Sequence, residues 1–203
     1  MSGKFIVIEG LDATGKSTLV SKLVDQLNAV SLKCPPRLDA PELSVRDLRS
    51  YFDDRPHAQR RAYYRAANLI ASEQAVRALE DSHVVMDRYW TSTVAYIALD
   101  EGFDVGEQFE ASYPPELREP DAVILLTVNE EKRVERIRER NRSVEREEQK
   151  LEFDAVRREN VLRRYRGFSP IEIDTSHRDP EAVLQATLDI LHNSGIILNE
   201  QLA

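Results

Sequence analysis

The chain has 203 residues, of which 41% are hydrophobic and 32% charged, and its formal net charge is -8 at pH 7. This length favours one domain with a sizeable core, and a transmembrane helix is excluded because no run reaches about 18 apolar residues. The acidic balance argues against a nucleic-acid partner, because a broad nucleic-acid-binding face needs a local excess of Lys and Arg.

Two features of the sequence bear on its cellular location. The sole cysteine, Cys34, cannot form an internal disulfide, which fits a reducing compartment. A strand-like run begins at Phe5, almost directly after Met1, so the N-terminus resembles neither a signal nor a transit sequence. We therefore expect a cytoplasmic protein with no membrane partner.

Five short apolar runs alternate with longer amphipathic segments along the chain. Val and Ile dominate the runs, as they do in buried parallel strands that are joined by crossover helices. This alternation predicts an α/β fold in a single domain of residues 1–203. The predicted strands cover residues 5–8, 29–32, 83–86, 122–128 and 171–173.

The segments between the runs carry helix signals. Residues 57–80 are rich in strong helix formers with apolar side chains at helical spacing. Asp179 and Pro180 read as an N-cap and first residue of a helix that extends to about His192, with Gly195 as its terminator. A further helix is predicted after the first strand by the apolar positions Val20, Leu23, Val24 and Leu27.

Residues 130–166 form the most charged part of the chain. They contain 13 of the 28 Lys and Arg residues and ten acidic residues, without glycine or proline. This composition predicts helix, with most charges in solvated Glu/Arg pairs that each contribute a few tenths of a kcal/mol.

The segment between the first strand and the first helix matches the phosphate-binding pattern G-x-x-x-x-G-K-[ST]. Glycines let such a turn wrap closely enough for backbone N–H groups to point at phosphate oxygens, and the helix N-terminus adds partial positive charge. The pattern predicts ATP and Mg²⁺ as ligands, with Lys16 on the β- and γ-phosphates and Ser17 on the metal. The expected phosphate-binding residues are Gly10, Asp12, Ala13, Thr14, Gly15, Lys16, Ser17 and Thr18.

A second polar pair, Asp87 and Arg88, follows the third apolar run. It therefore lies at the carboxyl end of a predicted strand, where open α/β sheets bind ligands. The carboxylate can take part in the Mg²⁺ site, and the guanidinium can bind a phosphate through two parallel hydrogen bonds. An isolated Asp-Arg pair is usually a surface ion pair, but the phosphate-binding loop favours a catalytic role for both residues.

Four segments resemble the thymidylate kinase family of P-loop nucleoside monophosphate kinases, and they run from the first strand to the last helix: residues 5–18, 87–92, 95–96 and 173–176. Residues 9–15 and 87–90 are most similar to the branch that contains the mitochondrial UMP/CMP kinase. The resemblance implies a P-loop NTPase three-layer sandwich with a five-stranded parallel sheet and an arginine-rich lid. It also implies a homodimer in which ATP and a nucleoside monophosphate meet end to end above the loop.

The resemblance assigns roles to several side chains at the acceptor nucleotide. Asp12 would contact the sugar 3′-hydroxyl and Arg88 would hold the acceptor phosphate. Tyr64 would stack on the base, and Asn68, which shares a helix face with it, would read the base edge. Tyr96 would crowd the sugar 2′ position and so favour deoxyribose.

Further arginines follow from the same resemblance. Arg49 or Arg37 would be a second ligand of the acceptor phosphate, and Arg49 is the preferred choice. Ala13 stands where some thymidylate kinases carry an arginine that reaches the transferring phosphoryl group. Without it, the positive charge would come from a lid at about residues 138–150, with Arg140 and Arg146 as catalytic residues and Arg142 as a ligand of ATP.

Together these features predict phosphorylation of a pyrimidine deoxynucleoside monophosphate by ATP, with dTMP as the preferred substrate. A UMP/CMP or dUMP/dCMP kinase is the main alternative, because Asn68 replaces the arginine of many relatives and an amide can meet thymine, uracil or cytosine.

Two other classes fit less well. A deoxynucleoside kinase needs a carboxylate near the 5′-hydroxyl, for which Glu9 is a weak candidate. A non-catalytic nucleotide-binding regulator would be favoured by the loss of Lys16, Asp87 or the lid arginines, and none of these is lost.

Overall fold

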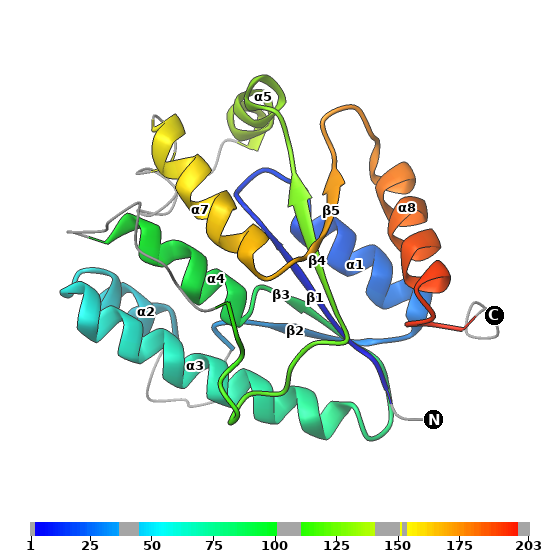
Figure 1. The fold of residues 1–203 in the computed structure, drawn as a ribbon, viewed down its shortest axis with the longest axis horizontal. Coiled ribbons are helices and arrows are strands. Elements are labelled where there is room, and N and C mark those ends of the chain that lie inside the picture. Colours follow the sequence, from blue (N-terminus) through cyan, green and yellow to red (C-terminus); the bar gives the residue numbers. More distant parts are fainter. Residues whose placement is uncertain (1–2, 37–44, 101–110, 141–150, 152–153, 199–203) are drawn as a thin grey trace.

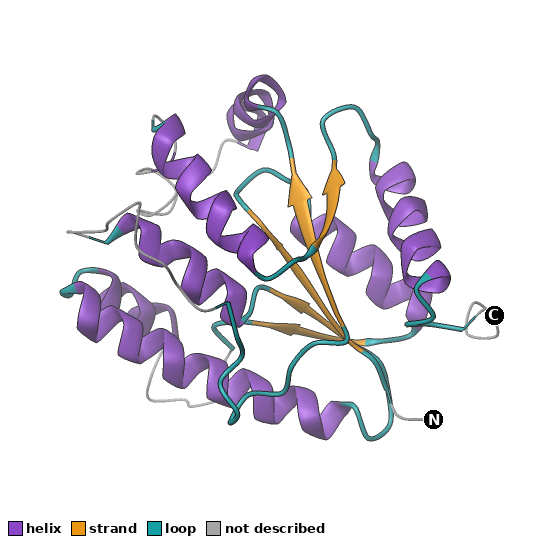
Figure 2. Cartoon of the chain, in the orientation of Figure 1, coloured by secondary structure: helices purple, strands orange, loops and turns teal. Residues whose placement is uncertain are grey.

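The structure is a computed structural model, and it describes residues 3–36, 45–100, 111–140, 151 and 154–198. Of residues 45–47 and 140, only the backbone is described. A central sheet lies between two layers of helices (Figures 1 and 2). Within these segments, no helix combines the length and the apolar character needed to cross a bilayer.

The sheet has five parallel strands in the order β2-β3-β1-β4-β5. The strand β1 is central, and its Ile6 pairs with Val85 on one side and with Ala122 on the other. All five predicted strands are confirmed, with ends that differ from the prediction by one or two residues. Their bounds are β1 Phe5–Gly10, β2 Val30–Lys33, β3 Val84–Asp87, β4 Ala122–Thr127 and β5 Ile171–Asp174.

Alternate side chains of β1 pack against different helical layers. Ile6 and Ile8 belong to a core formed with α1 (Lys16–Leu27) and α8 (Pro180–Asn193). Phe5 and Val7 face α3 (His57–Ala78), and a neighbouring cluster on that side joins α4 (Trp90–Ala95) and α7 (Ala155–Gly167). The two layers bury both faces of the sheet, as parallel strands require.

Cap residues confirm the predicted helix α8. The Asp179 carboxylate accepts a hydrogen bond of 2.8 Å from the backbone N–H of Ala182, and Pro180 occupies the first turn. Gly195 adopts a φ of +67° and donates its N–H to the carbonyl of His192, which ends the helix.

The remaining elements surround the carboxyl ends of the strands. They are α2 (Val45–Asp53), the 3-10 helix η1 (Tyr96–Leu99) and α5 (Glu130–Arg140). The helices α5 and α7 confirm the two ends of the charged helical segment. Arg142, Arg146 and the expected lid from residue 141 onward lie outside the described residues, as does Arg37, and the side chain of Arg140 is not described.

Candidate active site

Backbone conformation explains the glycines of the loop between β1 and α1. Gly10 has a φ of +141°, and a Cβ atom there would lie 2.5 Å from the carbonyl oxygen of Leu126 on β4. Gly15, which precedes α1, has a φ of +97°. Ala13 also lies in the left-handed region, with a φ of +64°. Glycine adopts positive φ without strain, so Gly10 and Gly15 allow the loop to wrap tightly, as predicted.

Two side chains of the loop donate hydrogen bonds to one of its own backbone carbonyls. The Lys16 ammonium donates to the carbonyl of Leu11 at 2.7 Å and lies 3.8 Å from a carboxylate oxygen of Asp12. The hydroxyl of Thr14 donates to the same carbonyl at 2.9 Å. Burial, and then the nearby charge of Arg88, lowers the pKa of Lys16 to about 8. The site therefore holds a cation whose charge is poorly compensated, as an anion-binding site requires.

Two residues from outside the loop hold its carbonyl groups. Arg136 of α5 donates to the carbonyl of Ala13 at 3.1 Å and to the carbonyl of Thr175 at 2.8 Å. The hydroxyl of Thr175, after β5, donates to the carbonyl of Thr14 at 3.1 Å. Sequence reasoning predicted solvated pairs in the Arg136 region, so this clamp was missed.

Asp87 ends β3 and faces the same space as Ser17 at the start of α1. One Asp87 carboxylate oxygen, Oδ1, is buried without a hydrogen-bond partner in the described part of the chain, and the other lies 3.6 Å from the Lys33 ammonium. The Lys33 side chain is 61% exposed, so it can move aside. A buried carboxylate oxygen and a serine hydroxyl that line the same cleft are donors that suit Mg²⁺.

Arg88 is aimed at the loop by its backbone, which has a φ of +68° and donates its N–H to the Ile8 carbonyl at 3.0 Å. Its Nη2 donates to Asp12 Oδ1 at 2.9 Å. Its Nη1 lies 3.2 Å from the hydroxyl of Tyr96 and 3.4 Å from that of Tyr165. The guanidinium is therefore positioned by contacts on both of its ends.

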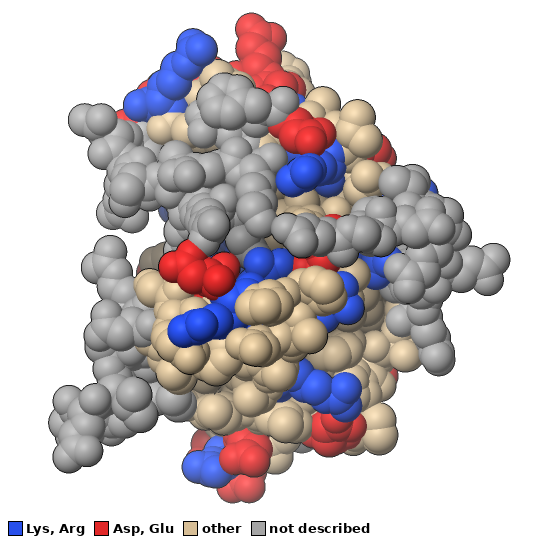
Figure 3. All heavy atoms as spheres, turned by 90° about the vertical axis from the view of Figure 1, so that its left-hand side faces the viewer, with Lys and Arg blue, Asp and Glu red and all other residues tan. Residues whose placement is uncertain are grey.

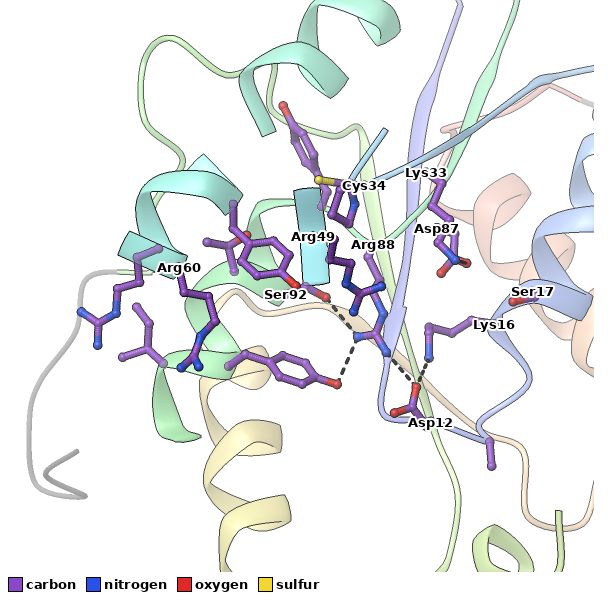
Figure 4. A pocket seen from close by; sticks show the side chains of 18 of the residues that line it. Asp12, Lys16, Ser17, Lys33, Cys34, Arg49, Arg60, Asp87, Arg88 and Ser92 are labelled. Atoms are coloured by element: carbon purple, nitrogen blue, oxygen red, sulfur yellow. Dashed lines mark hydrogen bonds and ion pairs between the residues drawn. The ribbon is translucent and has the colours of Figure 1, made fainter. Parts of the chain in front are cut away.

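One cleft of about 1170 Å³, a volume that includes solvent at its mouth, is lined by Asp12, Lys16, Ser17, Asp87 and Arg88. Figure 4 shows Arg49 and Arg88 pointing into the same part of the cleft, with Asp12 and Lys16 nearby and Ser17 and Asp87 beyond them. Figure 3 shows Lys and Arg atoms across the middle of one face of the molecule, with acidic atoms among them. The cationic residues that line the cleft are Lys16, Lys33, Arg49, Arg60, Arg61 and Arg88.

Tyr64 and Asn68 were predicted to face the base together, and the structure separates them. Tyr64 lines the cleft, and its hydroxyl donates to Asp53 at 3.1 Å. Asn68 is fully buried beneath the residues that line the cleft. Its amide nitrogen donates to the Tyr64 carbonyl and to the hydroxyl of Thr93, each at 2.7 Å. Thr93, which accepts a hydrogen bond from this amide, lines the cleft.

The other predicted residues divide between the cleft and its surroundings. Tyr96, Arg49 and Ala13 line the cleft, whereas Thr18 is exposed and does not. Among the residues that sequence reasoning missed, Asp100 is buried at the edge of the cleft and pairs with both Arg60 and Arg61. Neighbouring arginines on an exposed helix gave no signal of this network.

Glu9, on β1, lies behind the cleft with none of its surface exposed. Its carboxylate accepts from the backbone N–H groups of Tyr89 at 2.9 Å and Ser92 at 3.2 Å. It also accepts from the hydroxyl of Thr91 and, at 2.5 Å, from the hydroxyl of Ser92. Burial raises the pKa of Glu9, while the hydrogen bonds from Ser92 and Thr91 act against that rise.

Comparison with known proteins places the chain among kinases. A family model described as thymidylate kinase matches residues 8–186. Human mitochondrial UMP-CMP kinase 2 is 35% identical over 202 residues, which cover 95% of this chain but 44% of that relative's length. Thymidylate kinase from Brachyspira hyodysenteriae is 27% identical over 202 residues, with 97% of both chains covered. The solved structure of thymidylate kinase from Candida albicans shares the fold, with a TM-score of 0.72 at 20% identity, and covers 96% of this chain and 93% of its own.

Proposed function

Because the chain belongs to the thymidylate kinase family, we propose that it transfers the γ-phosphoryl group of ATP to a pyrimidine deoxynucleoside monophosphate, converting dTMP to dTDP. One observation carries this proposal: the Arg88 guanidinium and the Lys16 ammonium of the phosphate-binding loop line the same cleft, and both lie next to Asp12, at 2.9 Å and 3.8 Å from its carboxylate. A phosphate group bound by the loop and another bound by Arg88 would therefore lie close together in this cleft, which is the arrangement that phosphoryl transfer between nucleotides requires.

The donor half of the cleft is assigned to ATP and Mg²⁺. Inward N–H groups of residues 10–18 would hold the phosphates, and Lys16 would bridge the two terminal ones. Ser17 and Asp87 would hold Mg²⁺, which when bound neutralises charge that develops on the transferring group. Oδ1 of Asp87, which is buried and has no hydrogen-bond partner among the residues that the structure describes, supports this assignment.

The acceptor half is assigned to the nucleoside monophosphate. Arg88 and Arg49 would hold its phosphate, and Asp12 would accept a hydrogen bond from the sugar 3′-hydroxyl. Tyr64 would stack on the base, Tyr96 would lie against the sugar, and the lining position of Thr93 supports a base contact in place of Asn68.

Transfer itself needs little from the protein beyond positioning and positive charge, because the acceptor phosphate oxygen is already a nucleophile. Lys16 and Arg88 would neutralise charge from opposite sides. We further propose that a lid at about residues 138–150 closes over ATP and excludes water, with Arg140, Arg142 and Arg146 around the phosphates.

A direct assay tests the substrate assignment. Purified protein with ATP and Mg²⁺ is given dTMP, dUMP, UMP, CMP and dCMP separately, and kcat/KM is compared. We expect the highest value for dTMP. A higher value for UMP or CMP would instead support the activity named for the human relative, UMP-CMP kinase 2.

The same assay addresses the two remaining classes. Thymidine should not be phosphorylated, because the four hydrogen bonds that Glu9 accepts leave it buried and unavailable as a base. Turnover of thymidine in preference to dTMP would identify a deoxynucleoside kinase. Tight binding of ATP without turnover of any monophosphate would identify a non-catalytic regulator.

The assembly and location of the protein stay predictions of the sequence. A homodimer is expected from the resemblance to the family, and a reducing compartment such as the cytoplasm fits the sole cysteine, Cys34. Sedimentation velocity of the purified protein would test the dimer, and a species of the monomer mass at all concentrations would contradict it.

A further inference from the structure

Glu9 is a buried carboxylate to which the proposed transfer assigns no task. It is fully buried and does not line the cleft, yet it contacts the segment that follows Arg88. Its Oε1 accepts from the N–H groups of Tyr89 and Ser92, which bracket the start of α4, a helix with no cap from the side chain of Tyr89. Glu9 therefore joins β1 to the turn that carries Arg88.

The chemistry of a carboxylate fixes the direction of the next hydrogen bonds. In its ionised form Glu9 can only accept, and the Ser92 hydroxyl then donates its single proton to Glu9 Oε2 at 2.5 Å. The Ser92 oxygen can then only accept, and the Tyr165 hydroxyl, 2.8 Å away, must donate to it. The Tyr165 oxygen in turn is left as an acceptor.

Both oxygens thus present lone pairs to the same group. Arg88 Nη1 lies 3.4 Å from the Ser92 hydroxyl and 3.4 Å from the Tyr165 hydroxyl. A guanidinium has only hydrogen-bond donors, so neighbouring oxygens that accept stabilise its position and neighbouring groups that donate do not. The far nitrogen, Nη2, remains on Asp12 at the cleft.

We propose that Glu9 is a positioning residue that orients the Ser92 and Tyr165 hydroxyls as acceptors and thereby holds Arg88 in place for the acceptor phosphate. This inference rests on the proposed function, because it gives Arg88 the acceptor phosphate as its ligand. Glu9 acts through Ser92 and Tyr165 and contacts neither nucleotide. The effect of changing it must therefore depend on Ser92.

Glu9→Gln isolates this effect, because it keeps the shape of the side chain but replaces one acceptor by an NH₂ donor. The carbonyl oxygen of Gln can still accept from the two backbone N–H groups, while its NH₂ donates to the Ser92 oxygen and competes with Arg88. The loss of one hydrogen bond to a charged group corresponds to about tenfold in affinity. We therefore expect KM for dTMP to rise about tenfold and KM for ATP to stay within about twofold.

A double-mutant cycle separates this role from a plain structural one. Ser92→Ala alone should weaken dTMP binding, and adding Glu9→Gln to it should change KM for dTMP by less than about twofold. Thr91→Val is the matched control, because it removes a donor to Glu9 without touching Arg88, and it should leave KM for dTMP within about twofold. Multiplicative effects of Glu9→Gln and Ser92→Ala, or an equal loss in Thr91→Val, would overturn the proposal.

A binding measurement keeps this test independent of turnover. Calorimetry with dTMP, and with inorganic phosphate in the presence of a non-hydrolysable ATP analogue, reports on the Arg88 site directly. Failure of the wild-type protein to phosphorylate any monophosphate would reject the proposed function alone. Unchanged affinity for both probes in Glu9→Gln, in a protein whose Tm is not lowered, would reject the role of Glu9.

Discussion

Lys16 is buried between a carbonyl group and a carboxylate, and this environment should appear in the pH dependence of catalysis. Burial, followed by the charge of Arg88, lowers its pKa from 10.5 to about 8. The charged form is needed for the phosphates of ATP, so kcat/KM for ATP, which reports the free enzyme, should fall as pH rises above about 8. A series from about pH 6.5 to about 9.5 measures this, and a constant value throughout would contradict it.

Unfolding should not cause that decline. Between the folded-state pKa of about 8 and the unfolded value of 10.5, the folded state holds fewer protons on Lys16 than the unfolded state does. The contribution of this group to the free energy of unfolding therefore increases with pH across that window. Circular dichroism at each pH is the control, because activity should fall while the folded signal persists.

A substitution of Arg88 should distinguish the kinetic constants for dTMP from those for ATP. Arg88→Ala should lower kcat/KM for dTMP by about 10²-fold, because charge-assisted hydrogen bonds to phosphate are lost, and should change KM for ATP little. It should also move the decline in kcat/KM for ATP to higher pH, because Arg88 helps to lower the pKa of Lys16. Equal losses for both substrates would contradict its assigned place.

The same residues show what sequence could and could not predict about the site. The loop and Arg88 were found because short-range backbone geometry fixes them, with glycines at positive φ and a polar pair directly after a strand. The burial of Asn68 depends on Thr93, which comes from another helix. No local pattern at residue 68 records that partner, so its exposure could not be predicted.

At the scale of elements, the strands were predictable and the roles of charged helices were not. Runs of Val and Ile, buried on both faces of a parallel sheet, stand out in the sequence as short continuous apolar segments. The helix α5 is charged along its whole length, so the pattern cannot distinguish Arg136, which clamps the loop, from Lys132, which makes a surface pair with Glu135.

Arg136 and Lys132 therefore form a matched pair for a test of this helix. Arg136→Met removes donors to the carbonyls of Ala13 and Thr175, so the loop should lose its fixed orientation and KM for ATP should rise about tenfold, with little change for dTMP. Lys132→Met should change neither constant, because an exposed ion pair contributes about 0–1 kcal/mol. Similar kinetics for the two variants would show that α5 does not support the ATP site.

At the scale of the whole molecule, the carboxyl ends of β1 and β3 bring two half-sites into one cleft. A ligand that joins adenosine and thymidine through five phosphates should fill both halves, because the second nucleotide binds at the high effective concentration set by the linker. It should therefore bind more tightly than ATP or dTMP alone.

Thermal unfolding can measure this coupling. At about 100 times its Kd, a ligand that binds only the folded state adds about 2.7 kcal/mol, which for a protein of this size raises Tm by roughly 5–10 °C. At equal concentration, the linked ligand should exceed ATP and dTMP added together. Arg88→Ala should remove the excess while leaving the shift with ATP, because only the acceptor half depends on that guanidinium. A linked ligand that stabilises no more than ATP would show that the loop and Arg88 do not serve one reaction.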